Sequence, residues 1–318
     1  MSFDVVKKML KNELEVLDTI IYNELYSDVN LIKNISDYIV SYGGKRIRPI
    51  LTILMSKALG YSGKNHIVLS AVIELIHTAT LLHDDVVDNS DKRRGRLTVN
   101  KKWGNREAIL VGDFLYTRAF QVMLNIKNFS VLDVIANTTN KLSEGEVIQL
   151  VNKNNLFLDE KSYLEIIERK TAVLFSAATE IAAIISSVSD NDKISISSFG
   201  LQLGIAYQLI DDILDYNNYD KDVGNDFYEG IYTLPLIYLM KKSNEKEKKY
   251  ISSLLSNYDS ESFLKLRSLI LNSGSIDYVF NIAKQKIEKA TSLISHLFSN
   301  DYKNIIIDLS NFVLNRKF

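Results

Sequence analysis

Residues 73–88 read IELIHTATLLHDDVVD, and this stretch carries most of the information about the fold. Its apolar residues recur at three- and four-residue spacing, which predicts a buried helix. The helix would end in Asp84, Asp85 and Asp88, which we call the first acidic set. At 100° per residue, Asp84 and Asp88 fall about 40° apart on one helical face, with Asp85 beside them.

Residues 206–216, AYQLIDDILDY, repeat this pattern. They contain the second acidic set, Asp211, Asp212 and Asp215, which begins 127 positions after the first (211 minus 84). Burying such carboxylates without a partner costs on the order of several kcal/mol per ion, so each set needs a positive charge nearby. Mg²⁺ is the natural candidate, because it accepts carboxylates together with phosphate oxygens and water. One DDxxD at a helix end is common, but two copies in apolar helices favour a metal site.

Helical periodicity extends through most of the chain and predicts an all-α fold. Glycine occurs 13 times and proline twice, so helix breakers are scarce. Strand-like alternation is hard to find, and roughly a dozen helices are expected. No linker rich in serine, glycine or proline divides the chain, so a single domain over residues 1–318 is the simplest interpretation. Residues 275–318 suggest two amphipathic helices.

Composition excludes several classes of protein. The chain has 318 residues, a net charge of -1 and 46% hydrophobic residues, which argues against disorder and against bulk nucleic acid as the main partner. The absence of cysteine excludes disulfides, a thiolate nucleophile and a cysteine-based zinc site. The N-terminal residues lack a signal-peptide pattern, and the weakly polar stretch at 172–188 is too interrupted to span a membrane. We therefore expect a soluble, cytoplasmic protein with no transmembrane segment.

Basic residues cluster near the first acidic set and in one motif before it. Lys45, Arg46 and Arg48 lie in GGKRIRP, and Arg93 and Arg94 follow the first acidic set closely. Arginine binds phosphate oxygens in a bidentate way, whereas lysine acts more as a point charge. A single basic residue is more often an ordinary surface residue, but this grouping favours a role in phosphate binding.

Other polar residues near the two sets leave alternatives open. Lys170, beside Thr171, and Lys221 add isolated positive charges near expected helix ends. His77 lies seven residues before the first acidic set, on the same helical face. It is either a core histidine bonded to a backbone carbonyl or a phosphate donor. Gln208 is similarly either a core amide or a substrate contact.

Taken together, the motifs resemble those of trans-polyprenyl diphosphate synthases. The motifs occur in the family's order: GGKRIRP, LLHDDVVDNSDKRRG, GDFLYTRAF, GEVIQL, RKTA, YQLIDDILDY and EGxxTLPL. The match runs from Leu25 to Met240, and the opening SDVNLIKNISDYIVSYGGKRIRP is most similar to bacterial members that form octaprenyl diphosphate. The two DDxxD motifs with their neighbours are highly specific, and the flanking apolar matches are less so.

The resemblance implies an isoprenoid synthase-type helical bundle around a central cavity, in a homodimer. It implies Mg²⁺-dependent, head-to-tail condensation of isopentenyl diphosphate onto an allylic diphosphate such as farnesyl diphosphate. Roughly two or three Mg²⁺ ions would act at each site. The product would be a long chain, octaprenyl diphosphate for quinone side chains.

The family's site residues carry over position by position. The metal ligands would be Asp84, Asp88 and Asp211, supported by Asp85, Asp212 and Asp215. The catalytic set would comprise Asp84, Asp85, Asp88, Asp211, Asp212 and Lys170. The allylic diphosphate would be held by Arg93, Lys170, Thr171, Gln208 and Lys221. Isopentenyl diphosphate would be held by Lys45, Arg48, His77 and Arg94.

The chain departs from the family pattern after the second acidic set. Asp220 stands where the family usually has glycine before the lysine, and the loop from Asp215 to Lys221 is about four residues short. Ile231, in GIYTLP, replaces a frequent lysine. These changes put the role of Lys221 and the closure of the site in question.

Three small or flexible residues are candidates for setting product length. Short-chain relatives tend to have a bulky aromatic residue where this chain has Ala79 and Thr80, so a growing tail could pass deeper here. Met123 is either the floor of that tunnel or an ordinary core residue.

Alternatives remain for the product and for the function. The product could be shorter or longer, from geranylgeranyl to decaprenyl. A class I terpene cyclase also uses Mg²⁺ and aspartates, but it would not explain GGKRIRP or the Arg93-Arg94 pair. A catalytically silent subunit of a heteromeric synthase would be expected to lose an acidic motif, and both are intact.

Overall fold

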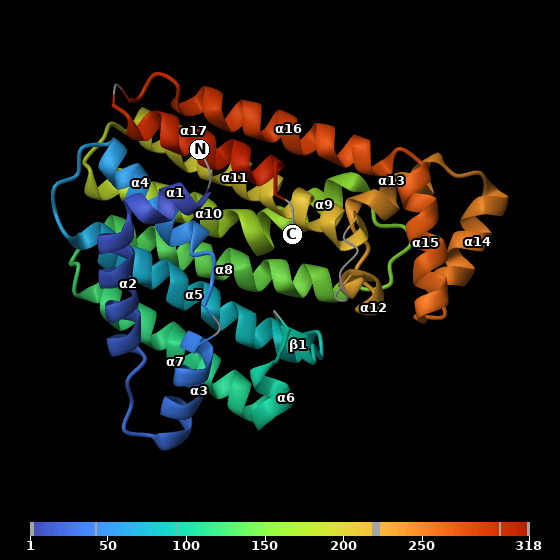
Figure 1. Cartoon of the computed structure of the whole chain (residues 1–318), viewed down its shortest axis with the longest axis horizontal. Coiled ribbons are helices and arrows are strands. Elements are labelled where there is room, and N and C mark those ends of the chain that lie inside the picture. Colours follow the sequence, from blue (N-terminus) through green and yellow to red (C-terminus); the bar gives the residue numbers. More distant parts are fainter. Residues whose placement is uncertain (1–2, 42, 94, 218–222, 299, 317–318) are drawn as a thin grey trace. The chain divides into compact units, whose positions relative to one another are not determined.

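The structure is a computed structural model that describes residues 3–41, 43–93, 95–217, 223–298 and 300–316. Over these residues it contains seventeen α-helices, a π-helical segment and one short hairpin (Figure 1). The hairpin pairs β1 (Lys92–Arg93) with β2 (Arg96–Leu97) in antiparallel register. The all-α prediction is therefore confirmed, although the helices are shorter and more numerous than the dozen expected.

The chain forms two compact units. Unit 1 comprises Met1–Thr139, Ala177–Ser197 and Ser295–Asp308, and unit 2 comprises Asn140–Ser176, Ser198–Ile294 and Leu309–Phe318. The elements wholly in unit 1 are, besides the hairpin, α1 (Phe3–Met9), α2 (Lys11–Glu24), α3 (Asn30–Ser41), α4 (Ile47–Ala58), α5 (Asn65–Val87), α6 (Val99–Trp103) and α7 (Asn105–Leu124). Those wholly in unit 2 are α9 (Glu160–Ile167), η1 (Glu168–Ala172), α12 (Asn225–Tyr228), α13 (Leu234–Lys242), α14 (Glu245–Leu255), α15 (Ser260–Asn272) and α16 (Ser275–Ile294). Four helices contribute residues to both units: α8 (Phe129–Val151), α10 (Val173–Ile185), α11 (Asp190–Asn217) and α17 (Tyr302–Leu314).

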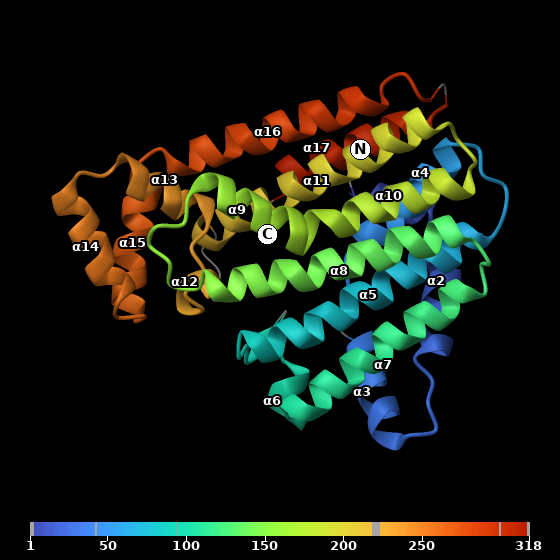
Figure 2. The same cartoon turned by 180° about the vertical axis from the view of Figure 1, so that it is seen from behind.

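Helix α5 is the central element of unit 1. It packs against α2, α4, α6 and α7, and Figures 1 and 2 show α7 running beside it in both views. Residues 71–73 and Ile76 on α5 are fully buried, as are Ile50 and Leu54 on α4. By length and composition α5 could also cross a membrane, but 61% of its most apolar 18-residue window is buried inside the structure, as in the core helix of a globular bundle.

The chain leaves α5 through a Schellman motif that fixes the position of the first acidic set. The amide of Ser90 donates to the carbonyl of Asp85 at 2.9 Å, and the amide of Asn89 donates to that of Val86 at 3.3 Å. Asn89 adopts the left-handed conformation, with φ of 52°, which asparagine tolerates well at a helix end. Asp84 and Asp85 therefore lie in the last turn of α5, and Asp88 is its C-cap.

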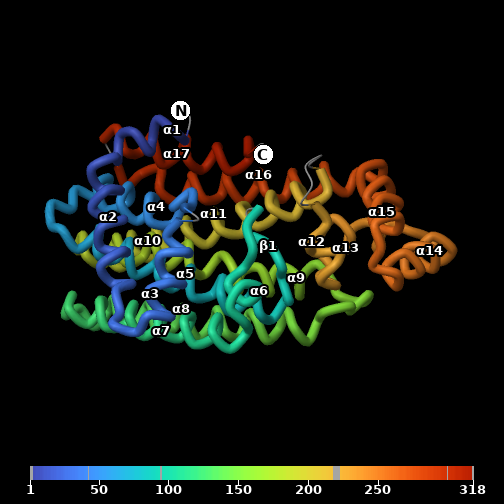
Figure 3. Tube along the Cα trace, turned by 60° about the horizontal axis from the view of Figure 1, so that its bottom comes forward, coloured from blue at the N-terminus to red at the C-terminus, as the bar shows by residue number. Residues whose placement is uncertain are grey.

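In unit 2 the second acidic set lies directly beside an aromatic core. Tyr216, which follows Asp215, is fully buried, and its ring centroid lies 6.5 Å from that of Phe263. Phe227 lies 5.5 Å from the same Phe263 ring. This cluster joins the end of α11 to α12, α13, α14 and α15, the last two of which lie side by side in Figure 3.

The surface segments follow local sequence rules. The lysine-rich run at 241–249 divides at Asn244, whose side chain caps α14 and forms a capping box with Glu247. The two amphipathic helices expected after residue 275 are α16 and α17.

Gly224 is required by both its conformation and its surroundings. Its φ is 82°, and a Cβ atom built on it would lie 2.6 Å from the Phe263 ring. We expect Gly224→Ala to lower the free energy of unfolding by about 2–5 kcal/mol, because the left-handed conformation costs about 1–2 kcal/mol and overpacking adds about 1–3 kcal/mol. Denaturant unfolding followed by circular dichroism measures the change.

Gly274→Ala is the matched control in the same unit. Gly274 has φ of 77°, but nothing lies within 4 Å of its hypothetical Cβ. Its substitution should cost only the conformational part. Equal losses for the two variants would show that the Phe263 contact does not matter.

Candidate active site

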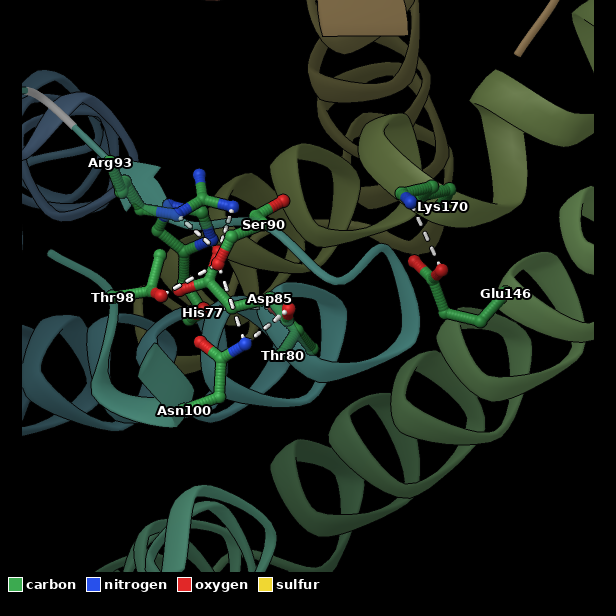
Figure 4. A network of polar contacts seen from close by, with 9 residues as sticks. All are labelled: His77, Thr80, Asp85, Ser90, Arg93, Thr98, Asn100, Glu146 and Lys170. Atoms are coloured by element: carbon green, nitrogen blue, oxygen red, sulfur yellow. Dashed lines mark hydrogen bonds and ion pairs between the residues drawn. The ribbon is translucent and has the colours of Figure 1, made fainter. Parts of the chain in front are cut away.

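Asp85 is the buried member of the first acidic set, and Arg93 is its partner. The Arg93 Nε atom donates to Asp85 Oδ1 at 2.9 Å, and Nη2 lies 2.8 Å from the same oxygen (Figure 4). The Asn100 amide donates to the Asp85 carbonyl at 3.0 Å, and the Thr98 hydroxyl donates to the Ser90 carbonyl at 2.6 Å. These bonds connect the hairpin and α6 to the end of α5, and they place Arg93 beside the first acidic set; its role in phosphate binding stays a prediction.

The electrostatics at this end of α5 favour a bound cation. Burial raises the pKa of Asp85 and the Asp88 charge adds to this, while Arg93 opposes both. Asp84 and Asp88 are half-buried. All three carboxylates lie at the C-terminal end of a helix, where the dipole is negative and acidic side chains are unfavourable. A cation bound here would relieve that repulsion.

A small cavity of about 70 Å³ in unit 1 brings His77 together with Asp85 and Arg93. Arg46 also lines it and forms an ion pair of 2.6 Å with Glu74, which is almost buried. The structure thus places His77 at the rim of the first acidic set rather than away from it.

The GGKRIRP motif forms the start of α4. Arg46 is the N-cap of α4 with φ of 54°, and its side chain is committed to Glu74. Lys45 and Arg48, the two predicted diphosphate ligands of this motif, flank it and are half-buried. Arg94, the fourth predicted ligand of isopentenyl diphosphate, lies outside the described residues.

In unit 2, several predicted residues form one hydrogen-bonded chain. The Thr171 hydroxyl donates to Gln208 Oε1 at 2.9 Å, and Gln208 Nε2 donates to Asp212 Oδ1 at 2.9 Å. Asp212 Oδ2 accepts a short bond from the Tyr163 hydroxyl. Burial and the Asp212 charge raise the pKa of Tyr163 well above its ordinary value, so this phenol is the donor. Gln208 is therefore a bridge between Thr171 and the second acidic set.

Lys170 and Thr171 lie on η1, a π-helical segment of the kind often found at functional sites. The Lys170 ammonium lies 3.0 Å from a carboxylate oxygen of Glu146. Figure 4 shows the two side chains facing each other. Gly145 on α8 and Gly204 on α11 let those backbones approach η1, because added Cβ atoms would lie 2.8 Å from the Lys170 amide nitrogen and 2.6 Å from the Ala172 Cα. The wide π-helical turn of η1 is thus packed closely against both α8 and α11.

Asp212 and Asp215 differ from Asp211 in what they bind. Burial raises the pKa of Asp212 to about 7, against the opposing effect of its donors Tyr163 and Gln208. Asp215 accepts from the amides of Gly224 and residue 225 with one oxygen and from that of Asp226 with the other, at 2.9, 3.1 and 3.3 Å. Asp215 therefore caps α12, although burial still raises its pKa.

Asp211 pairs with Arg316, which lies just after the end of α17. The Arg316 Nη1 atom lies 2.7 Å from Asp211 Oδ1. Only 4% of the Arg316 side chain is exposed, against 35% for Asp211. Asp211 is thus the member of the second acidic set that combines solvent access with a cationic partner.

The chain-length candidates lie in the core of unit 1. Ala79 on α5 is fully buried and Thr80 is half-buried, with its hydroxyl donating to the His77 carbonyl at 2.8 Å. Met123 on α7 is 2% exposed. Their proposed role in product length remains a prediction.

Sequence reasoning missed four residues that complete these networks. They are Tyr163, Glu146, Asp226 and Arg316. Tyr163 lies two helical turns before Lys170, and that spacing could have suggested a shared face. Asp226 is half-buried, and burial together with Asp215 and Asp212 raises its pKa well above the ordinary value. No sequence signal links Arg316 to Asp211, since they are more than a hundred positions apart.

The residues present suit a hard divalent cation. Carboxylate oxygens are the ligands that Mg²⁺ prefers, and Asp84, Asp88 and Asp211 are accessible enough to supply them. Among the described residues, no three acidic or histidine side chains converge closely enough to hold a metal unaided. Mg²⁺ does not require such a cage, because it is commonly bound by one or two carboxylates together with phosphate and water.

Comparison with known proteins decides the family. The family model for polyprenyl synthetase matches residues 29–270. The chain belongs to the polyprenyl synthetase family. An octaprenyl diphosphate synthase of Haemophilus influenzae is 39% identical over 323 residues, covering 100% of this chain and 98% of the relative.

Solved structures of the polyprenyl synthetase family share the fold. A polyprenyl synthase from Caulobacter crescentus, complexed with calcium and isoprenyl diphosphate, superposes with a TM-score of 0.95 at 34% identity, covering 100% of this chain and 98% of that one. A decaprenyl diphosphate synthase from Rhodobacter capsulatus gives 0.94 at 33% identity, covering 99% and 100%.

The structure describes one of the two departures from the family pattern, Ile231, but not the other, the loop with Asp220 and Lys221. Ile231, which replaces a frequent lysine of polyprenyl synthetases, is half-buried. Asp220 and Lys221 lie outside the described residues, so the predicted role of Lys221 stays a prediction.

Burial of Asp212 should give the metal-free protein a pH-dependent stability, which its hydrogen bond from Tyr163 partly offsets. The pKa of Asp212 rises from 3.8 to about 7 on folding, so stability falls as pH rises through that window, where only the folded state holds the proton. Tyr163→Phe removes a donor that favours the ionised form and raises this pKa further. We expect a loss of about 1–3 kcal/mol at about pH 8.5 and a smaller loss at about pH 5.5, measured by urea unfolding with a chelator present.

Tyr278→Phe provides the control. The Tyr278 hydroxyl also donates to a carboxylate, that of Glu160, at 2.9 Å, but this pair is less buried. Its loss should be small and nearly constant across the same pH range. A pH-independent loss for Tyr163→Phe would contradict the role assigned to Asp212.

Proposed function

We propose that this chain is a trans-polyprenyl diphosphate synthase. It would join isopentenyl diphosphate head to tail to an allylic diphosphate such as farnesyl diphosphate and release a long-chain product. Family membership and full-length similarity to an octaprenyl diphosphate synthase support this activity. Octaprenyl diphosphate is the product we favour, with a quinone side chain as its use.

The observation that carries the proposal is the state of the first acidic set. Three carboxylates lie at the negative end of the α5 dipole, and Asp85 is buried against Arg93. That arrangement stores repulsion which a divalent cation with a diphosphate would relieve. A helix end with only a structural role would gain no stability from three clustered carboxylates.

The residues would divide the work as follows. Asp84, Asp88 and Asp211 would hold divalent metal, and roughly two or three ions fit the diphosphate chemistry. Bound Mg²⁺ supplies Lewis-acid stabilisation of charge on a diphosphate. Arg93, Lys170, Thr171 and Gln208 would contact the allylic diphosphate, with Lys221 as a further candidate. Lys45, Arg48, His77 and Arg94 would hold isopentenyl diphosphate.

The protein's own contribution to the chemistry is electrostatic. In this proposal Arg93 and Lys170 would supply positive charge to the departing diphosphate, which would stabilise ionisation of the allylic C–O bond. The isopentenyl double bond then attacks the allylic carbocation, and a proton is lost to the released diphosphate. Apolar residues along the proposed path of the prenyl tail, such as the buried Ala79, would exclude the water that would quench the cation.

Exposed apolar side chains support a homodimer. In unit 1 they include Leu110 and Leu124 on α7 and Phe129 on α8, exposed to 67%, 59% and 88%. In unit 2 they include Leu150 and Val151 on α8. Such residues suit an interface between protomers. A monomeric mass in solution would contradict this part of the proposal.

We also propose that the chain acts as one synthase domain in the cytoplasm. The family model runs through residues of both units. The alternative of a silent subunit in a heteromeric synthase is less favoured, because both acidic sets are present. Product formation by the purified chain alone would exclude that alternative.

Substitution of the metal ligands tests the activity. Asp84→Ala and Asp211→Ala should each lower turnover by about 10²-fold or more, because each removes charge that balances the metal in the transition state. Incorporation of labelled isopentenyl diphosphate measures it. Asp190→Ala removes an exposed aspartate from the same helix as Asp211 and should leave turnover unchanged. Near-normal rates in the Asp84 or Asp211 variant would refute the assignment.

Product length tests the position of the prenyl tail. Position 79 lies five residues, about 7.5 Å along the helix, before Asp84, so Ala79→Tyr should stop elongation at about fifteen carbons. Met123→Ala should act in the opposite direction and lengthen the products. Mass spectrometry of the products made from geranyl diphosphate and isopentenyl diphosphate measures both, because this primer is shorter than the product expected for Ala79→Tyr. A folded Ala79→Tyr enzyme with unchanged products would rule out this path for the tail.

A further inference from the structure

Arg316 makes two contacts with the same face of α11. Its guanidinium pairs with Asp211 at 2.7 Å, and its Cζ atom lies 4.1 Å from the centroid of the Tyr207 ring. Tyr207 and Asp211 are four residues apart, which places them one turn apart on one helical face. Arg316 therefore rests on Tyr207 while it reaches Asp211.

The surroundings make this pair more than a surface ion pair. Only 4% of the Arg316 side chain is exposed, so its charge depends on a nearby anion. Stacking on an aromatic ring further limits the positions that the planar guanidinium can adopt. A buried arginine held in this way is a fixed charge rather than a mobile surface group.

The other members of the second acidic set are differently engaged. Asp212 accepts from Tyr163 and Gln208, and Asp215 accepts three backbone amides. Asp211 alone of the three forms an ion pair among the contacts given for the described residues. Asp211 is also the principal metal ligand predicted for this set, so one carboxylate would serve both Arg316 and the metal.

We propose that Arg316 is the resident cation of the second acidic set: it holds Asp211 in the metal-free enzyme and competes there with the divalent metal. This inference rests on the proposed function, because it takes Asp211 as a metal ligand. Arg316 is a positioning residue in this role. It keeps the Asp211 carboxylate ordered and neutralised until metal arrives, and so it sets the metal concentration at which this set fills.

The direction in which metal affinity changes when Arg316 is removed distinguishes competition with the metal from a purely structural role. A positive charge a few ångströms from a divalent cation opposes its binding, so loss of that charge should tighten metal binding. If Arg316 only shaped the site, its loss would disorder Asp211 and weaken metal binding. The two roles thus predict opposite shifts.

Mn²⁺ binding without diphosphate is the test, followed by the electron paramagnetic resonance signal of free Mn²⁺. The background carries Asp84→Asn and Asp88→Asn, so that the second acidic set dominates binding. In this background we expect Arg316→Gln to bind Mn²⁺ about three- to tenfold more tightly. Unchanged or weaker binding by a folded Arg316→Gln protein would overturn the inference.

Two variants serve as controls. Lys265→Gln removes the same charge from unit 2, but Lys265 pairs with the exposed Glu261 rather than with the second acidic set, so Mn²⁺ affinity should not change. Asp211→Asn should abolish the Mn²⁺ binding measured in this background. If Asp211→Asn binds Mn²⁺ normally, both the ligand assignment and the inference fail. If it abolishes binding and Arg316→Gln has no effect, the inference alone fails.

A measurement on the wild-type enzyme covers the case in which Arg316→Gln does not fold. The Nε–Hε signal of Arg316 is identified in an arginine spectrum as the signal that Arg316→Lys lacks. Mg²⁺ should shift this signal, because metal at Asp211 displaces or repels the guanidinium. A signal unchanged at saturating Mg²⁺ would overturn the inference.

Discussion

Repulsion between carboxylates is the constraint on which the rest of this structure depends. Each acidic set lies at the C-terminal end of a long helix, where the dipole adds to the repulsion. The surrounding chain lowers that cost with particular partners: Arg93 for Asp85, amides for Asp215, and Arg316 for Asp211. The negative charge that these partners leave uncompensated suits a divalent metal, and a bound metal would in turn attract diphosphate. This supports the function proposed for this polyprenyl synthetase.

Most of the fold and the identity of the acidic residues could be predicted from local sequence. Helical periodicity predicts α5 and α11, and the DDxxD spacing places the aspartates on them, because both depend only on residues within a few turns. His77 and Gln208 were left between a core role and a site role. The structure places His77 in a cavity beside Asp85 and Gln208 between Thr171 and Asp212, and their roles toward a substrate stay predictions.

The division of roles within each set could not be predicted in the same way. Three aspartates at one spacing look alike in a sequence, yet Asp212 is buried between two donors, Asp215 caps a helix and Asp211 pairs with Arg316. Each difference depends on a partner distant along the chain or on a turn that begins after the motif. The π-helical form of RKTA is likewise invisible locally, because close glycine contacts from two other helices accompany it.

Acidic and aromatic residues are adjacent at two places in unit 2, and this has a consequence for how the enzyme loses its structure on heating or in denaturant. Asp215 precedes the buried Tyr216, and Asp226 precedes the buried Phe227, so neighbouring side chains serve the polar network and the ring cluster. Heat or denaturant that separates the rings must also scatter the carboxylates. On the proposed function, loss of aromatic packing in this part of the molecule is therefore also loss of the second acidic set as a metal site.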